Sequence, residues 1–155
     1  MLLVILNEII NFGERLYMDN SDKKYYLSQI QEIVKRMGSN SFVVKGWFIT
    51  LITAMYAVYF HNNDFRSLIG VIIVSLLFWY HDAYYLSLER SYRNFFDRAR
   101  MMNSSEIDFS LELKKEDRVS LISSAFRPIL IGSYGVVILG TLLVLAFSLG
   151  VWYGK

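Results

Sequence analysis

Three apolar stretches without a single Asp, Glu, Lys or Arg constrain the fold of this chain more than any other feature. They are residues 46–63, 67–81 and 128–154. A helix of about 20 apolar residues is about 30 Å long, which matches the hydrocarbon core of a bilayer. The chain has 155 residues, enough for one domain, and 54% of them are hydrophobic. We therefore predict an all-α integral membrane protein with about three transmembrane helices, because backbone polar groups in lipid must be paired within the protein.

The polar segments between the apolar stretches divide the chain into four predicted regions. Before residue 38, apolar residues recur with the spacing of one helical face, and the sequence Gly38-Ser39-Asn40 is expected to stop or bend that helix. The short polar sequence at 61–64 leaves room only for an antiparallel return. The regions are N-terminal cytoplasmic or interfacial helices (1–40), a transmembrane hairpin (41–82), a cytoplasmic helical region (83–127) and a third transmembrane helix (128–155).

The second apolar stretch is predicted to be part of a longer helix. No Gly or Pro ends it at His81, and apolar residues continue at helical spacing from Tyr84 to Met101. A helix of roughly forty residues is about 55 Å long, so its second half is expected to extend out of the membrane into the cytoplasm. Beyond it, residues 103–106 are predicted to form a turn or a capping box, and residues 114–126 a further helix.

The distribution of basic residues predicts the orientation in the membrane. Six Lys and Arg residues precede or begin the first span, and eight lie between the second and the third. The turn between the first two spans has only Arg66, and the C-terminal end has only Lys155. Basic residues concentrate on the cytoplasmic side. We therefore predict a protein of the bacterial cytoplasmic (inner) membrane, with its N-terminus inside and its C-terminus outside.

Composition argues against several classes of function. The chain has no Cys, and its two His residues lie at opposite ends of the second span, so a metal site is not expected. The sequence contains no phosphate-binding loop and no nucleophile motif. The net charge is only +2, and residues 83–127 carry eight basic against seven acidic residues, so no nucleic acid partner is expected. We expect no catalytic residue, no cofactor and no enzymatic activity.

Two charged residues at the membrane boundary are the first candidates for a functional role. Lys45 begins the first span, and Asp82 ends the second span on the same side. In an antiparallel hairpin they lie at similar depth, and we predict that they form an ion pair. Such a pair either clamps the hairpin or acts as a gate in an oligomeric pore. The candidates for lining such a pore carry hydroxyl groups: Thr50, Thr53, Ser67 and Ser75.

The helix that follows Asp82 is dense in aromatic residues and arginines. Within it, Glu89 and Arg93 are four residues apart and can pair along the helix. Acidic residues neutralise much of the positive charge, so this face suits a protein partner better than a nucleic acid. We predict a subunit or partner interface made of Tyr84, Tyr85, Glu89, Arg90, Tyr92 and Arg93.

Two blocks of the sequence resemble a known family. One is residues 30–42, IQEIVKRMGSNSF, followed by KGW at 45–47; the other is residues 78–86, FWYHDAYYL, followed by Glu89, Arg90 and Arg93. They resemble the RipA family of small octameric bacterial membrane proteins, which is similar in general plan to the membrane accessories of RNA-targeting CRISPR systems. The resemblance covers residues 26–100. It implies association with the lipid bilayer as a homo-oligomer, an octamer by analogy, with a helical portion in the cytoplasm.

The resemblance also implies a role in phage defence or envelope stress, with a protein partner encoded by a neighbouring gene. The CRISPR accessories have been ascribed a nuclease signature in which an Arg is followed a few residues later by a His. No Arg of this chain stands in that relation to His61 or His81. The predicted function is an oligomeric membrane protein that forms a pore or perturbs the membrane. The alternative is a membrane-anchored scaffold or interaction protein without conductance.

Overall fold

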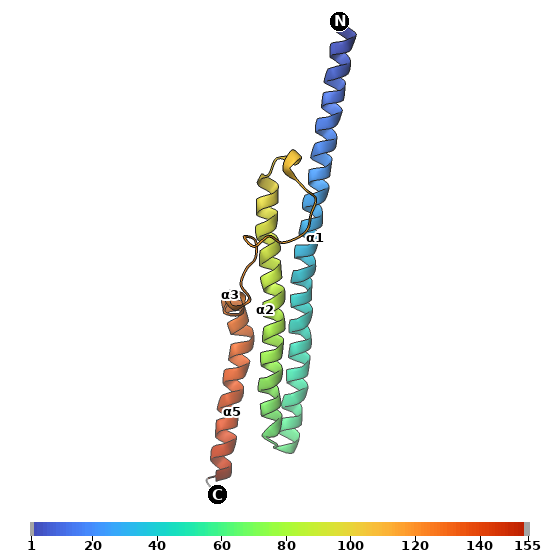
Figure 1. Cartoon of the computed structure of the whole chain (residues 1–155). Coiled ribbons are helices and arrows are strands. Elements are labelled where there is room, and N and C mark those ends of the chain that lie inside the picture. Colours follow the sequence, from blue (N-terminus) through green and yellow to red (C-terminus); the bar gives the residue numbers. More distant parts are fainter. Residues whose placement is uncertain (1, 154–155) are drawn as a thin grey trace.

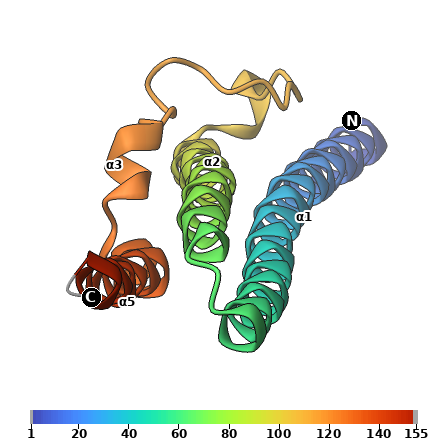
Figure 2. The same cartoon turned by 90° about the horizontal axis from the view of Figure 1, so that it is seen from below.

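Three long helices dominate the computed structural model, which describes the backbone of residues 2–153 and the side chains of residues 21–150 other than Ser105 (Figure 1). α1 (Leu2–Asn62) and α2 (Arg66–Met101) form an antiparallel hairpin. α5 (Val136–Tyr153) runs beside α2, which lies between α1 and α5 when the molecule is seen along the helices (Figure 2). The shorter elements are η1 (Ser104–Glu106), α3 (Leu121–Ala125), α4 (Pro128–Leu130) and η2 (Ile131–Gly135).

The prediction of an all-α chain with three long apolar helices is confirmed. The stretches that are long and apolar enough to cross a membrane are Ser21–Asn62, Arg66–Met101 and Pro128–Gly150. Many large apolar side chains point outward from them; Trp47 is 62% exposed, Leu143 65% and Phe147 75%. Soluble monomeric proteins rarely expose apolar surface on this scale. The outer surface of the three helices is therefore suited to lipid or to contact with other helices.

α1 is a single helix of 61 residues, so the predicted break at Gly38-Ser39-Asn40 is wrong. A glycine within a helix costs only about 1 kcal/mol, and packing against a neighbouring helix outweighs that cost. In this chain the neighbour is α2, whose Glu89 carboxylate lies beside Gly38; a Cβ at Gly38 would be 3.6 Å from Glu89 Oε2. The helix therefore passes residue 40 without interruption.

Replacement of Gly38 by Ala is expected to stabilise the protein by about 0.5–1 kcal/mol. Ala is the better helix former, and its Cβ would make an ordinary van der Waals contact with Glu89. The free energy of unfolding in detergent measures this, with Ser39→Ala on the exposed side of the same turn as the control. A clear loss of stability in Gly38→Ala would contradict a continuous α1.

α2 has 36 residues and agrees with the long helix predicted from the sequence. The residues it buries are mostly small or short: Leu68, Val71, Ser75, Asp82, Ala83, Ser87, Ser91, Phe95 and Ala99. Small side chains on this face allow α1 and the third apolar helix to approach the backbone of α2 closely.

Two separate apolar clusters hold the helices together. The first joins all three apolar helices and includes Phe48, Val71 and Tyr134. The second lies at the opposite end of the hairpin from the 63–65 turn, and it includes Tyr26 and Phe95. We call this end of the molecule the open end of the hairpin.

The segment between α2 and α5 is mostly irregular, so the helix predicted over residues 114–126 is wrong for its first half. Only Leu121–Ala125 is an α-helix. The carboxylate of Asp117 accepts a hydrogen bond from the backbone N–H of Lys114, and such local side-chain bonds compete with a helix. The predicted capping box is confirmed, since Asn103 and Glu106 exchange the two bonds that define it. Trp79 donates its indole N–H to the carbonyl of Ala125 and so fastens α3 to α2.

Candidate functional site

A fully buried carboxylate lies where the three apolar helices meet. The side chain of Asp82, on α2, is 0% exposed. Its Oδ2 is 2.6 Å from the Nζ of Lys45 on α1, and it accepts a hydrogen bond from the hydroxyl of Tyr134 at 3.0 Å. Its Oδ1 accepts a hydrogen bond from the hydroxyl of Ser41, also on α1. We call Ser41, Lys45, Asp82 and Tyr134 the Asp82 network.

Helix geometry explains how α1 supplies two of these groups. Ser41 and Lys45 are four residues apart and therefore occupy the same face of the helix, the face that packs on α2. The ammonium of Lys45 also donates to the Ser41 hydroxyl at 2.8 Å. One turn of α1 thus presents a cation and a hydroxyl donor to a single carboxylate.

A π-helical segment supplies the remaining donor. Pro128 opens the third apolar helix at its first turn, where its missing N–H costs nothing. Residues 131–135 then follow a π-helical course before α5 begins. Tyr134 lies in this segment, fully buried, with its ring against Phe48 and stacked parallel to the ring of Trp79. Single π-helical turns within α-helices occur frequently at functional sites.

The network compensates the cost of burying a charge. Removing a carboxylate from water costs several kcal/mol, and the cost is recovered only when the geometry is good and the remaining lone pairs are used. Here one ion pair and two hydroxyl donors serve the two oxygens of Asp82. Among the side chains described, no buried polar atom lacks a partner. The side chain of Lys45 is 27% exposed, so this residue is only partly enclosed by the protomer.

The structure brings the two predicted boundary residues together, and it places the pore-lining candidates in two different environments. Thr50 and Thr53 lie on the exposed face of α1, with their hydroxyls bonded to carbonyls one turn back. Ser67 is half-buried near the turn. Ser75 is fully buried within the protomer and donates to the carbonyl of Val71. The inclusion of Ser75 is therefore corrected, because a side chain covered by its own chain cannot line a lumen between chains.

The predicted interface residues of α2 likewise separate into two groups. Tyr84 and Arg93 are exposed, and Arg93 pairs with Glu89 along the helix at 2.6 Å. Tyr85 is half-buried. Arg90 and Tyr92 instead face the chain's own connecting segment: Arg90 donates to the Ser124 hydroxyl, and the Tyr92 hydroxyl lies 3.5 Å from the Leu111 carbonyl. These two side chains help to dock that segment on α2.

Sequence reasoning missed Ser41 and Tyr134. Ser41 is one helical turn before Lys45, and that spacing was a usable signal. Tyr134 lies inside an apolar run more than fifty residues from Asp82, and no spacing rule connects the two. As for metals, no group of three His, Asp or Glu side chains in the described part of the chain is placed to hold an ion.

Comparison with known proteins finds no match: no protein-family model, no curated protein and no solved structure matches this chain. The resemblance to the RipA family therefore stays a prediction. The Asp82 network can fix three membrane-compatible helices relative to one another, and polar groups buried in such an environment usually serve a function.

Replacement of Tyr134 by Phe removes one donor from Asp82 and leaves the aromatic packing in place. Hydrogen bonds to charged groups are worth about 1.5–3 kcal/mol, so we expect a loss of that size in the free energy of unfolding. The matched control is Tyr59→Phe, whose hydroxyl contacts only the neutral Ser148 and whose loss should cost about 1 kcal/mol. Equal effects of the two substitutions would contradict a special role for the Asp82 contact.

Proposed function

We propose that this protein is an oligomeric membrane protein that forms a pore or perturbs the membrane, and that α1 of each protomer faces the central axis. The observation that carries the proposal is a stripe of small and hydroxyl-bearing residues along the exposed face of α1. The stripe consists of Gly46, Thr50, Thr53 and Ala57, all of them exposed. Residues three and four apart share one helical face, so the four lie in a line.

The stripe lies on the opposite side of α1 from the protomer's own core. Phe48 and Ile52, which pack against α2 and the third apolar helix, are half a turn away from Thr50. The surfaces beside the stripe on α1, and the outward surfaces of α2 and α5, carry bulky side chains such as Ile49, Leu77 and Leu143. Bulky apolar groups suit lipid, whereas small residues permit close contact between helices. The stripe on α1 is thus suited to the central axis of an oligomer, and the surfaces with bulky side chains are suited to lipid.

The threonine hydroxyls suit a lumen because they are satisfied within their own helix. Thr50 donates to the carbonyl of Gly46 at 3.0 Å, and Thr53 donates to that of Ile49 at 2.8 Å. Each hydroxyl oxygen keeps an acceptor lone pair for water or a cation. The Asp82 network supports this arrangement from the far side of α1, since it holds the helix against α2 and the third apolar helix.

We also propose an orientation in the membrane and a biological role. The basic residues of the chain favour the open end of the hairpin in the cytoplasm and the 63–65 turn outside. The resemblance to the RipA family favours a role in phage defence or envelope stress. A membrane-anchored scaffold without conductance is the competing function, and the experiment below separates the two.

The absence of cysteine from the sequence makes a clean accessibility experiment possible. Single variants Thr50→Cys and Thr53→Cys are reconstituted into liposomes, and ion flux is measured before and after a charged, water-soluble thiol reagent. The control is Leu143→Cys, which is 65% exposed on α5. We expect reaction and block of the flux at positions 50 and 53, and neither at 143. Absence of flux, or equal behaviour at all three positions, would refute the pore and favour the scaffold.

A further inference from the structure

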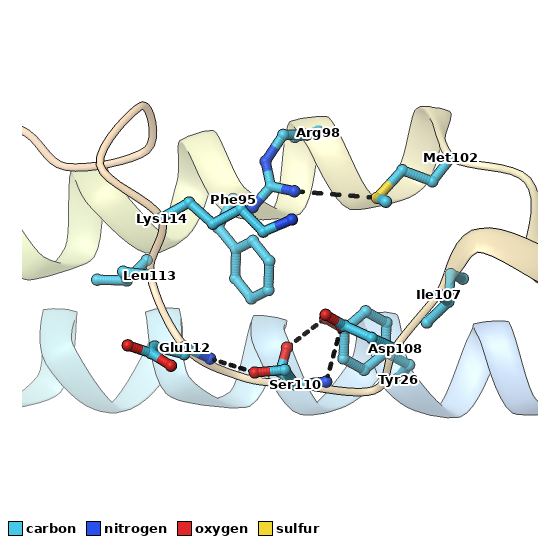
Figure 3. Close-up of a pocket in the computed structure, with 10 residues that line it drawn as sticks. All are labelled: Tyr26, Phe95, Arg98, Met102, Ile107, Asp108, Ser110, Glu112, Leu113 and Lys114. Carbon is cyan, nitrogen blue, oxygen red and sulfur yellow. Dashed lines mark hydrogen bonds between the residues drawn. The ribbon is translucent and has the colours of Figure 1, made fainter.

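A cavity lies at the open end of the hairpin, and no residue of the Asp82 network lines it. It has a volume of about 250 Å³ and is enclosed by α1, α2 and the segment 107–114 that crosses over them (Figure 3). Its floor is apolar: the side chains of Tyr26 and Phe95 are 5% and 3% exposed, and Ile107 is 9% exposed. The two aromatic rings meet edge to face. An aromatic or branched apolar group would find an apolar surface there.

One cationic side chain at the rim has an unused donor. Arg98 directs Nε and Nη2 at the two oxygens of Asp117, at 3.0 and 2.6 Å. Its Nη1 meets only the sulfur of Met102, at 4.0 Å, and a thioether is a weak acceptor. Figure 3 shows the guanidinium beside the Phe95 ring, and its Cζ is 5.1 Å from the ring centroid. The Asp117 contacts hold this guanidinium in place, so the Nη1 donor is positioned before any ligand arrives.

A second cationic side chain, Lys114, also lines the cavity. Lys114 belongs to the crossing segment, and its ammonium makes no ion pair within 4.0 Å in the described part of the chain. Figure 3 shows its side chain extending past the Phe95 ring toward Arg98. An anionic oxygen between these two side chains could accept hydrogen bonds from both Arg98 and Lys114. Charge-assisted hydrogen bonds of this kind are among the strongest in proteins.

The remaining charges limit what the cavity can accept. Asp108 and Glu112 also line it, so two acidic side chains balance the two basic ones. Asp117 and Glu116 also neutralise Arg98, with oxygens 2.6 and 3.4 Å from its guanidinium nitrogens. A ligand with several negative charges would therefore meet repulsion from the acidic rim, whereas a single anionic group can reach the two cations alone.

We propose that this cavity binds a small amphipathic monoanion, with an aromatic or branched apolar body on Tyr26 and Phe95 and one carboxylate between Arg98 and Lys114. Binding would join the crossing segment to the two helices. Because that segment continues through Asp117 and α3 to the third apolar helix, the ligand would stabilise the docked arrangement of the whole open end. The inference is independent of whether the protein conducts ions.

Phenylacetate is the probe, and the full chain in detergent is titrated by calorimetry. Phenylacetamide, which is neutral, and tripolyphosphate, which is multiply charged, are the comparison compounds. We expect saturable binding of phenylacetate, at least tenfold weaker binding of the amide, and none of tripolyphosphate. Partition of an apolar probe into the micelle is identified because it does not saturate and does not depend on the variant.

Three variants test the site itself. Lys114→Ala is expected to weaken phenylacetate binding about tenfold, the loss of one charge-assisted hydrogen bond. Lys115→Ala, the exposed neighbour that does not line the cavity, should leave the affinity unchanged. Ile107→Trp should fill the cavity and abolish binding. The proposal is overturned by absence of saturable binding, by equal affinity for acid and amide, or by equal affinity of the Lys114→Ala and Lys115→Ala variants.

Discussion

Asp82→Asn and Lys45→Met are each expected to destabilise the protein by about 3–5 kcal/mol, the cost of breaking a buried ion pair by removing one partner. Loss of the Asp82 charge leaves the Lys45 ammonium beside the Ser41 hydroxyl and without its counter-ion. Loss of Lys45 leaves a fully buried carboxylate with hydroxyl donors only. Unfolding in detergent, followed by circular dichroism, measures both.

The double variant distinguishes a specific pair from two independent effects. Lys45→Met combined with Asp82→Asn removes both charges, so its destabilisation should be several kcal/mol smaller than the sum of the single effects. Lys35→Met and Asp22→Asn change the same residue types at exposed positions of α1 and should each cost less than about 0.5 kcal/mol. Additive effects of the two network substitutions would show that the contact contributes nothing specific.

The second large effect is expected at the ion pair between Asp117 and Arg98, which docks residues 103–120 on α2. Asp117 is 2% exposed, and its two oxygens bind the guanidinium of Arg98. We expect Asp117→Asn to cost about 3 kcal/mol and to release residues 103–120 from α2 while the long helices remain folded. A spin label at Leu111→Cys reports this release as increased mobility in electron paramagnetic resonance. Glu116→Gln is the control, because Glu116 approaches the same guanidinium only at 3.4 Å and its side chain is 65% exposed.

Lowering the pH should also release residues 103–120 from α2 in the unaltered chain. The hydrogen bond from Arg98 lowers the pKa of Asp117 below its ordinary value. A carboxyl group with a depressed pKa in the folded state contributes stability in full above its unfolded pKa, near 4, and loses it as the pH falls through the folded value. The label should therefore be immobile at pH 6 and become mobile well below pH 4. A transition of unchanged size in Asp117→Asn would assign the acid response to other carboxyl groups.

The helices and the contact between Lys45 and Asp82 followed from local patterns in the sequence. Charge-free runs of membrane-spanning length predicted the three apolar helices, and a short turn placed residues 45 and 82 at equal depth. Helical spacing also predicted the extension of α2 to Met101. Each of these inferences depends on neighbours along the chain or on a hairpin, in which distance along the sequence determines proximity.

The features that escaped prediction depend on contacts between distant segments. The sequence at Gly38 predicts a break in the helix, yet the helix continues because α2 packs beside it. Residues 114–120 have a helical pattern in the sequence. The carboxylate of Asp117, however, binds the guanidinium of Arg98 on α2 and accepts a hydrogen bond from the backbone N–H of Lys114. Tyr134 reaches Asp82 from the π-helical turn that precedes α5. Glu89, Arg98 and Asp82 each lie more than two helical turns along the sequence from Gly38, Asp117 and Tyr134, the residues that they contact.

The unbroken course of α1 has a mechanical consequence. From Ser21 to Asn62 the helix is continuous, and the Asp82 network attaches it to α2 at residues 41 and 45. At about 1.5 Å per residue, its two arms extend about 35 Å and about 25 Å from Lys45. Because the helix is continuous, a tilt of the arm that begins at Ser21 would also displace the arm that carries Thr50 and Thr53. Any event at the open end of the hairpin could thus reach the stripe without an intervening change in fold.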